Sequence, residues 1–72
     1  MNEEGLKKYF ATYTECWKLF RKYSNPNNSC EFWDGLRDEA YSLYQKDKTE
    51  FRKNMIVETI NEIERVWKSR KE

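Results

Sequence analysis

Aromatic side chains recur at helical spacing along the whole of this chain, and no other feature constrains its fold as strongly. Four Phe, three Trp and five Tyr residues occur among 72, in a sequence that is otherwise 38% charged. A chain of this length has little interior, but each buried ring removes roughly 150–250 Å² from water, worth several kcal/mol at about 25 cal/mol per Å². A few rings are therefore enough to hold a small helical domain together.

The N-terminal third of the sequence carries the longest apolar stripe. Its members follow one another at steps of four, three, four and three residues: Leu6, Phe10, Tyr13, Trp17 and Phe20. This spacing predicts one face of a helix over about 3–23, turned toward the core, with Tyr9, Cys16 and Tyr23 widening the face. The turn-forming segment 24–29, which contains the only proline, predicts the end of this helix.

A second helix is predicted after this turn, over about 29–46. Either Asn28 or Ser29 is expected to cap it, and Asn28 with Glu31 approximates a capping box. Its inward residues recur at steps of three, four and three: Trp33, Leu36, Ala40 and Leu43. Gly35 weakens such a helix by up to about 1 kcal/mol relative to alanine, so we expect a neighbouring element to approach closely there.

A third helix is predicted over about 48–69. Asp47 is expected to cap it, with Glu50 reaching back to the cap. Its inward face is formed by Phe51, Ile56, Ile60, Ile63 and Trp67.

Three helices of similar length joined by short connections predict antiparallel neighbours, and hence an all-α, up-down-up three-helix bundle. The sequence has no internal repeat and no low-complexity linker, so residues 1–72 are expected to form one helical domain. The predicted core takes apolar residues from all three helices: Phe10, Tyr13, Trp17, Phe20, Trp33, Leu36, Ala40, Leu43, Phe51, Ile56, Ile60, Ile63 and Trp67.

The ionisable residues favour neither a catalytic nor a metal site. Histidine is absent, which removes the commonest general base and the commonest zinc ligand, and only Cys16 and Cys30 supply thiols. Cys30 lies in the first turn of the second helix, where a helix N-terminus can lower a thiol pKa, so a thiol enzyme or sensor is a third, minor hypothesis. We expect no enzyme activity, no metal and no cofactor.

Composition favours the cytoplasm. No apolar run approaches the roughly 20 residues of a membrane-spanning helix, and the first residues lack the apolar segment of a secretion signal. Two cysteines are more typical of reduced thiols than of the disulfide framework of a secreted protein. We therefore expect a cytoplasmic protein with no membrane partner.

Charge gives little support for nucleic-acid binding. The sequence has 14 Lys and Arg residues and 13 Asp and Glu residues, a formal charge of +1, without the basic excess of a nucleic-acid binder. The turn at 47–49 nonetheless imitates a helix-turn-helix, with Lys48, Arg52 and Lys53 facing phosphates. A small nucleic-acid-binding regulator that uses these residues or the basic first helix is the alternative hypothesis.

The aromatic surplus favours a protein partner. A core of this size holds roughly one large side chain per helical turn, so some rings are left at the surface, where Tyr and Trp contribute much contact area at low entropy cost. The leading hypothesis is a non-enzymatic interaction module that binds a protein partner or its own copy. The candidate partner-binding residues are Tyr9, Tyr23, Trp33, Tyr41 and Tyr44. In the competing interpretation these rings lie over the edge of the core with their polar ends in water.

Three patterns spread over nearly the whole chain resemble small uncharacterised proteins of gut Firmicutes and of their phages or conjugative elements. The patterns are Tyr13-x-x-x-Trp17-Lys18-Leu19-Phe20, then Trp33 with Glu39 and Tyr44, then Ile60-x-x-Ile63-Glu64-Arg65. The resemblance implies a compact helical fold and a bacterial or mobile-element origin. It implies no activity, cofactor or binding residue.

Overall fold

The computed structural model describes residues 2–71, which form an all-α bundle of three helices with no strand among them. Helix α1 covers Glu3–Lys22, α2 covers Cys30–Lys46 and α3 covers Glu50–Lys71. Every predicted helix end lies within two residues of the observed one. All three helices pack against one another, which confirms the predicted three-helix bundle.

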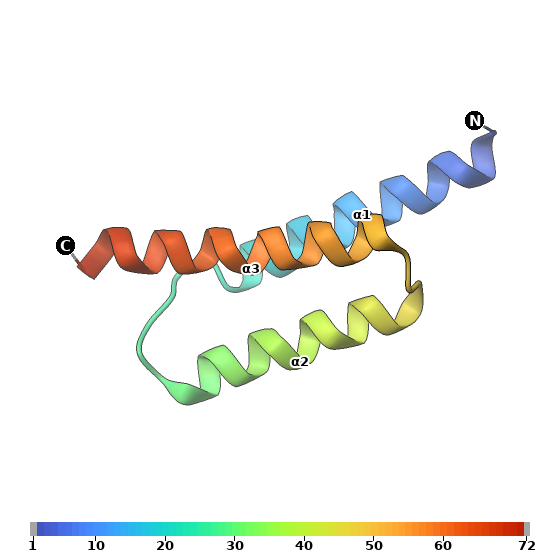
Figure 1. Ribbon diagram of the computed structural model, residues 1–72. Coiled ribbons are helices and arrows are strands. Elements are labelled where there is room, and N and C mark those ends of the chain that lie inside the picture. The colour runs from blue at the N-terminus through green and yellow to red at the C-terminus, as the bar shows by residue number, and fades with distance from the viewer. Residues whose placement is uncertain (1, 72) are drawn as a thin grey trace.

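The helices run up, down and up (Figure 1). Helices α1 and α3 point in the same direction, with the rings of Tyr9 and Phe51 at 4.9 Å between centroids near the start of the pair. At the far end of the pair, Arg70 donates a hydrogen bond to Asn25. The first turns of α1 project past the other two helices (Figure 1), so one end of the elongated molecule, which measures 45 × 20 × 18 Å, is a single helix.

Side chains cap two of the helices, in part where the sequence did not predict. Asn2 Oδ1 accepts a hydrogen bond from the Gly5 N–H at 2.9 Å, and Thr49 Oγ1 accepts one from the Arg52 N–H at 3.2 Å. The predicted cap at Asp47 is wrong, because Asp47 is the C-terminal cap residue of α2 and the side chain of Thr49 caps α3. Ser29, one of the two predicted caps, is the residue before α2, but its side chain makes no cap hydrogen bond. Because Ser29 and not Asn28 holds the cap position, the predicted capping box of Asn28 and Glu31 is wrong.

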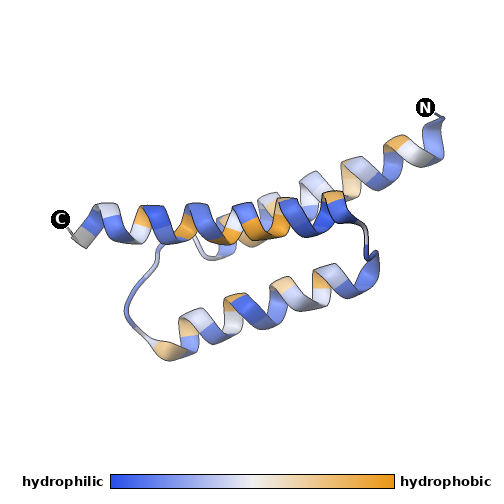
Figure 2. Ribbon diagram, viewed as in Figure 1, coloured by the Kyte–Doolittle hydropathy of each residue, from blue (hydrophilic) through white to orange (hydrophobic). Residues whose placement is uncertain are grey.

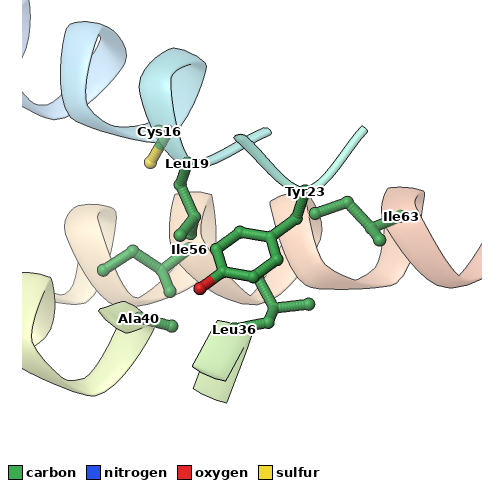
Figure 3. Close-up of a cluster of buried hydrophobic side chains, with 7 residues drawn as sticks. All are labelled: Cys16, Leu19, Tyr23, Leu36, Ala40, Ile56 and Ile63. Atoms are coloured by element: carbon green, nitrogen blue, oxygen red, sulfur yellow. The ribbon is translucent and has the colours of Figure 1, made fainter. Parts of the chain in front are cut away.

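The core lies where the three helices meet, and Figure 3 shows its residues converging from all of them. Leu36 and Ile63 are its most deeply buried side chains. Its members are Cys16, Leu19, Tyr23, Leu36, Ala40, Ile56 and Ile63. Around this cluster lies a ring of half-buried side chains: Phe20, Phe32, Trp33, Leu43, Tyr44, Met55 and Ile60. The predicted inward face of α2 is therefore in or beside the core, as are Ile56, Ile60 and Ile63 of α3. Phe51 and Trp67, which were also predicted for the core, are half-buried outside this cluster.

The predicted inward face of α1 is confirmed at Phe20, which packs against the core, and is wrong at three other predicted core residues. Phe10, Tyr13 and Trp17 are exposed, whereas the buried positions of α1 and its cap follow a neighbouring stripe with the same spacing: Thr12, Cys16, Leu19 and Tyr23. The apolar arc of α1 is wider than the surface that α2 and α3 cover. Small side chains at the centre of the contact let helices approach closely, so the small Thr12 and Cys16 face inward and the bulky rings stay outside. Figure 2 shows hydrophobic residues also in the part of α1 that projects past the bundle.

Candidate partner-binding face

Four large apolar side chains lie in a row on the outside of α1, and we name this row the α1 aromatic face. It consists of Leu6, Phe10, Tyr13 and Trp17, which are 54%, 73%, 56% and 57% exposed. At the helical rise of about 1.5 Å per residue, the row is roughly 16 Å long. Single exposed apolar residues are ordinary, whereas an uninterrupted row of four large ones makes this face the candidate binding surface of the described residues.

The inner edge of the face is held in place by ring contacts. The ring of Tyr13 meets Phe51 edge-on at 5.7 Å between centroids, and Trp17 stacks on Phe20 at 6.4 Å with an interplanar angle of 22°. Phe20 in turn packs against the core. Tyr13 and Trp17 are thus supported by neighbouring rings while more than half of each side chain stays exposed.

A shallow groove of about 290 Å³ runs beside the face, between α1 and α3. Apolar side chains and the Thr59 side chain form most of its lining, and two carboxylates stand at its α3 edge. The lining residues are Tyr13, Cys16, Trp17, Phe20, Met55, Glu58, Thr59 and Glu62. The groove therefore extends the apolar surface of α1 toward an acidic border.

The acidic border keeps a net negative charge. Arg65 donates hydrogen bonds to Glu58 and, at 3.2 Å, to Glu62. The hydrogen bond from Arg65 lowers the pKa of Glu58, and the same bond raises the pKa of the guanidinium. Two carboxylates thus face one cation at neutral pH, which leaves about one negative charge at this edge.

The five predicted partner-binding residues do not lie on one surface and differ in burial. Tyr9 is exposed and lies at the inner edge of the α1 aromatic face, against Phe51. Tyr23 is buried in the core, so it is not available to a partner. Trp33 and Tyr44 are half-buried against the core, and the Trp33 indole donates a hydrogen bond to the Asn27 carbonyl at 2.8 Å.

Tyr41 lies on a different surface of the bundle. It is 66% exposed and lines a groove of about 220 Å³ between α2 and α3, together with Val57, which is 46% exposed. This second apolar surface has two exposed members where the α1 aromatic face has four. It therefore serves as a natural control for the larger face.

The residues of the nucleic-acid alternative do not form one exposed group. Lys48 and Lys53 are exposed, but Arg52 is 4% exposed and donates hydrogen bonds to the Glu15 carboxylate and, at 2.9 Å, to the Leu43 carbonyl. The Arg52 guanidinium was expected to face phosphates, but it links α3 to α1 and α2 inside the bundle. This placement removes the central residue of the alternative hypothesis.

The two thiols lie in opposite environments. Cys16 is buried in the core, and desolvation raises its pKa, although a hydrogen bond with Thr59 opposes the shift. Cys30 is exposed as the first residue of α2. Within residues 2–71, no three metal-ligating side chains come together and no helix combines the length and apolarity needed to cross a bilayer.

Comparisons with models of protein families, with curated proteins and with solved structures gave no match. The resemblance to small proteins of gut Firmicutes stays a prediction.

Proposed function

We propose that the protein is a non-enzymatic interaction module that binds a helix of a protein partner, or of its own copy, through the α1 aromatic face. The supporting observation is the row of four large apolar side chains that are each more than half exposed. At roughly 150–250 Å² per large side chain, the row presents on the order of 400–500 Å² of apolar surface to solvent. An area of this size equals the largest apolar patch of a typical monomer, and such a patch is often functional.

The spacing of the row favours a helix as the bound element. Leu6, Phe10, Tyr13 and Trp17 are separated by steps of four, three and four, which is the a/d pattern of a coiled-coil seam. Side chains at these positions insert between side chains of a facing helix that carries the same pattern. An extended strand or a flat surface would leave the spaces between successive turns unfilled.

The chemistry of the row also favours a protein partner. Aromatic residues are enriched at the buried centres of protein interfaces and dominate their binding energy. Three of the four members are aromatic, and Tyr13 brings a hydroxyl group that can stay at a wet rim.

We further propose a cytoplasmic location and a bacterial or mobile-element origin. The free thiols of Cys16 and Cys30 are compatible with a reducing compartment. The origin is supported by the sequence resemblance alone.

The test is a selection of helical peptides from a displayed library against the full chain, with two matched double variants. Phe10→Ser with Trp17→Ser removes the α1 aromatic face, and Tyr41→Ser with Val57→Ser removes the control surface. All four positions are exposed, so both variants are expected to keep the helical circular dichroism of the parent. We expect selected peptides with an apolar heptad pattern that lose at least about tenfold in affinity for the first variant and little for the second. Peptides that bind both variants equally, or a selection without heptad-patterned binders, would refute the proposal.

A further inference from the structure

We infer that the α1 aromatic face binds α1 of a second copy of this chain. The two α1 helices then form a parallel dimer, with the two-fold axis between them and parallel to both. This inference rests on the proposed function and names the partner of the same surface. It follows from the heptad register of α1 together with the charges on its two flanks.

The heptad register of α1 places different chemistry on the two sides of the face. Leu6, Tyr13 and Phe20 occupy d positions, and Phe10 and Trp17 occupy a positions. The e positions on one side are Lys7, Thr14 and Arg21, and the g positions on the other side are Tyr9, Cys16 and Tyr23. The e flank is therefore basic and turned to solvent at Lys7 and Arg21.

The g flank of α1 borders α3 and its acidic edge. Tyr9 contacts Phe51, and Cys16 lines the groove whose opposite edge carries Glu58 and Glu62. One flank of the face is thus positively charged and the other negatively charged. A surface of this kind is complementary to itself when its two flanks exchange places across an axis.

A parallel arrangement brings these opposite charges together. In a parallel pair of helices, an e residue faces the g residue of the preceding heptad of its partner. Arg21 of one copy then lies over Cys16 of the other copy, where Glu58 and Glu62 form the border of the groove. Two-fold symmetry creates this contact twice, while the aromatic rows pack against each other along the axis.

An antiparallel arrangement brings like charges together instead. There the e flank of one helix faces the e flank of its partner, so Lys7 of one copy approaches Arg21 of the other. The two acidic borders meet on the opposite side. Like charges across an interface are unfavourable, so the flanks select the parallel dimer.

The size of the face sets the strength of the dimer. The row contributes on the order of 400–500 Å² of apolar surface per copy, against about 800 Å² of total surface per partner in an interface of standard size. The groove and the charged flanks supply part of the remainder. An interface of this size and polarity corresponds to a reversible dimer with a Kd of about 1 µM or weaker.

The test is sedimentation equilibrium of the full chain from low micromolar to millimolar concentration. We expect the molar mass to rise from that of a monomer toward twice that value, with a blue shift of the tryptophan emission. Phe10→Ser with Trp17→Ser should remain monomeric throughout, whereas Tyr41→Ser with Val57→Ser should dimerise like the parent. A parent chain that stays monomeric at millimolar concentration, or a dimer that the first variant retains, refutes the inference.

Charge exchange tests the parallel arrangement. Arg21→Glu and Glu62→Arg should each weaken the dimer by roughly tenfold, because symmetry repeats the affected pair twice, and the double variant should recover most of the loss. A double variant no stronger than the singles refutes the parallel dimer. If the parent chain is monomeric but helical peptides bind the α1 aromatic face, the proposed interaction module stands and the dimer is refuted. If the chain is monomeric and no helical peptide binds the face, both proposals are refuted.

Discussion

The hydroxyl oxygen of Tyr23 lies 3.0 Å from the point where a Cβ atom on Gly35 would stand. Tyr23 caps the end of α1 and is buried, and its ring meets Phe32 edge-on at 5.2 Å between centroids. The sequence predicted that a neighbouring element approaches Gly35 closely, and the approaching group is the phenol of Tyr23. A buried ring has little room to move away from an added methyl group.

Gly35→Ala is expected to destabilise the protein despite the better helix propensity of alanine. The propensity change favours the variant by up to about 1 kcal/mol, whereas crowding in a packed region costs about 1–3 kcal/mol. The net expectation is a loss of about 1 kcal/mol in the free energy of unfolding. Urea denaturation followed by circular dichroism measures it, with the m-value as the check on two-state behaviour.

Tyr23→Phe is the matched background for this substitution. Without the hydroxyl group, the next atoms of the ring lie at 3.9 Å from the added methyl, which is an ordinary contact. Gly35→Ala should therefore stabilise the Tyr23→Phe protein by up to about 1 kcal/mol. The explanation fails if Gly35→Ala has the same effect in both backgrounds.

Sequence periodicity was sufficient to predict the three helices, because their apolar residues recur at the helical period and turn-forming residues separate them. It was also sufficient for the cores of α2 and α3, where one apolar stripe stands against a charged face. Leu36, Ala40, Ile56 and Ile63 are buried as predicted.

The orientation of α1 could not be predicted from periodicity, because this helix carries two apolar stripes with the same spacing. The bulkier stripe contains Phe10, Tyr13 and Trp17, and hydrophobicity alone favours it as the inward face. The stripe through Thr12 and Cys16 is inward instead, since small side chains allow closer helix packing. The size of the side chains was the available signal for the exposed face, and their hydrophobicity was misleading.

The burial of Arg52 could not be predicted either. A cation next to the apolar stripe of a helix ordinarily extends into solvent, and its partner Glu15 lies 37 residues away in the sequence. Only the packing of α1 against α3 brings the two together.

The two partners of the Arg52–Glu15 ion pair are expected to differ in how much their removal lowers the free energy of unfolding. The Arg52 side chain is 5% exposed and that of Glu15 is 25% exposed. Glu15→Ala leaves a buried cation without its counter-charge and should cost about 3 kcal/mol in the free energy of unfolding. Arg52→Met leaves the better solvated Glu15, which also lies 3.6 Å from the Lys46 ammonium, and should cost about 1 kcal/mol. Denaturation midpoints at equal m-values compare the two, and a larger loss in Arg52→Met would contradict the assignment.

The two thiols are expected to differ sharply in their rate of alkylation, and two single-thiol variants separate them. Cys30→Ser reports on the buried Cys16, and Cys16→Ala reports on the exposed Cys30. At neutral pH we expect Cys16 to react at least about 100-fold more slowly than Cys30, because its reaction requires an opening of the bundle.

Alkaline pH adds an energetic consequence to this difference. Burial raises the pKa of Cys16 above its unfolded value. Its contribution to stability is therefore complete below the unfolded pKa of about 8.5 and is lost as the pH rises through the folded pKa. As the pH rises above about 8.5, the free energy of unfolding of Cys30→Ser should fall more steeply than that of Cys16→Ala. Equal pH slopes in the two variants would mean that the Cys16 thiol is not desolvated.

The alkylation rate of Cys30 tests the thiol-sensor hypothesis. Faster alkylation of Cys30 than of a thiol in an unfolded peptide would support that hypothesis.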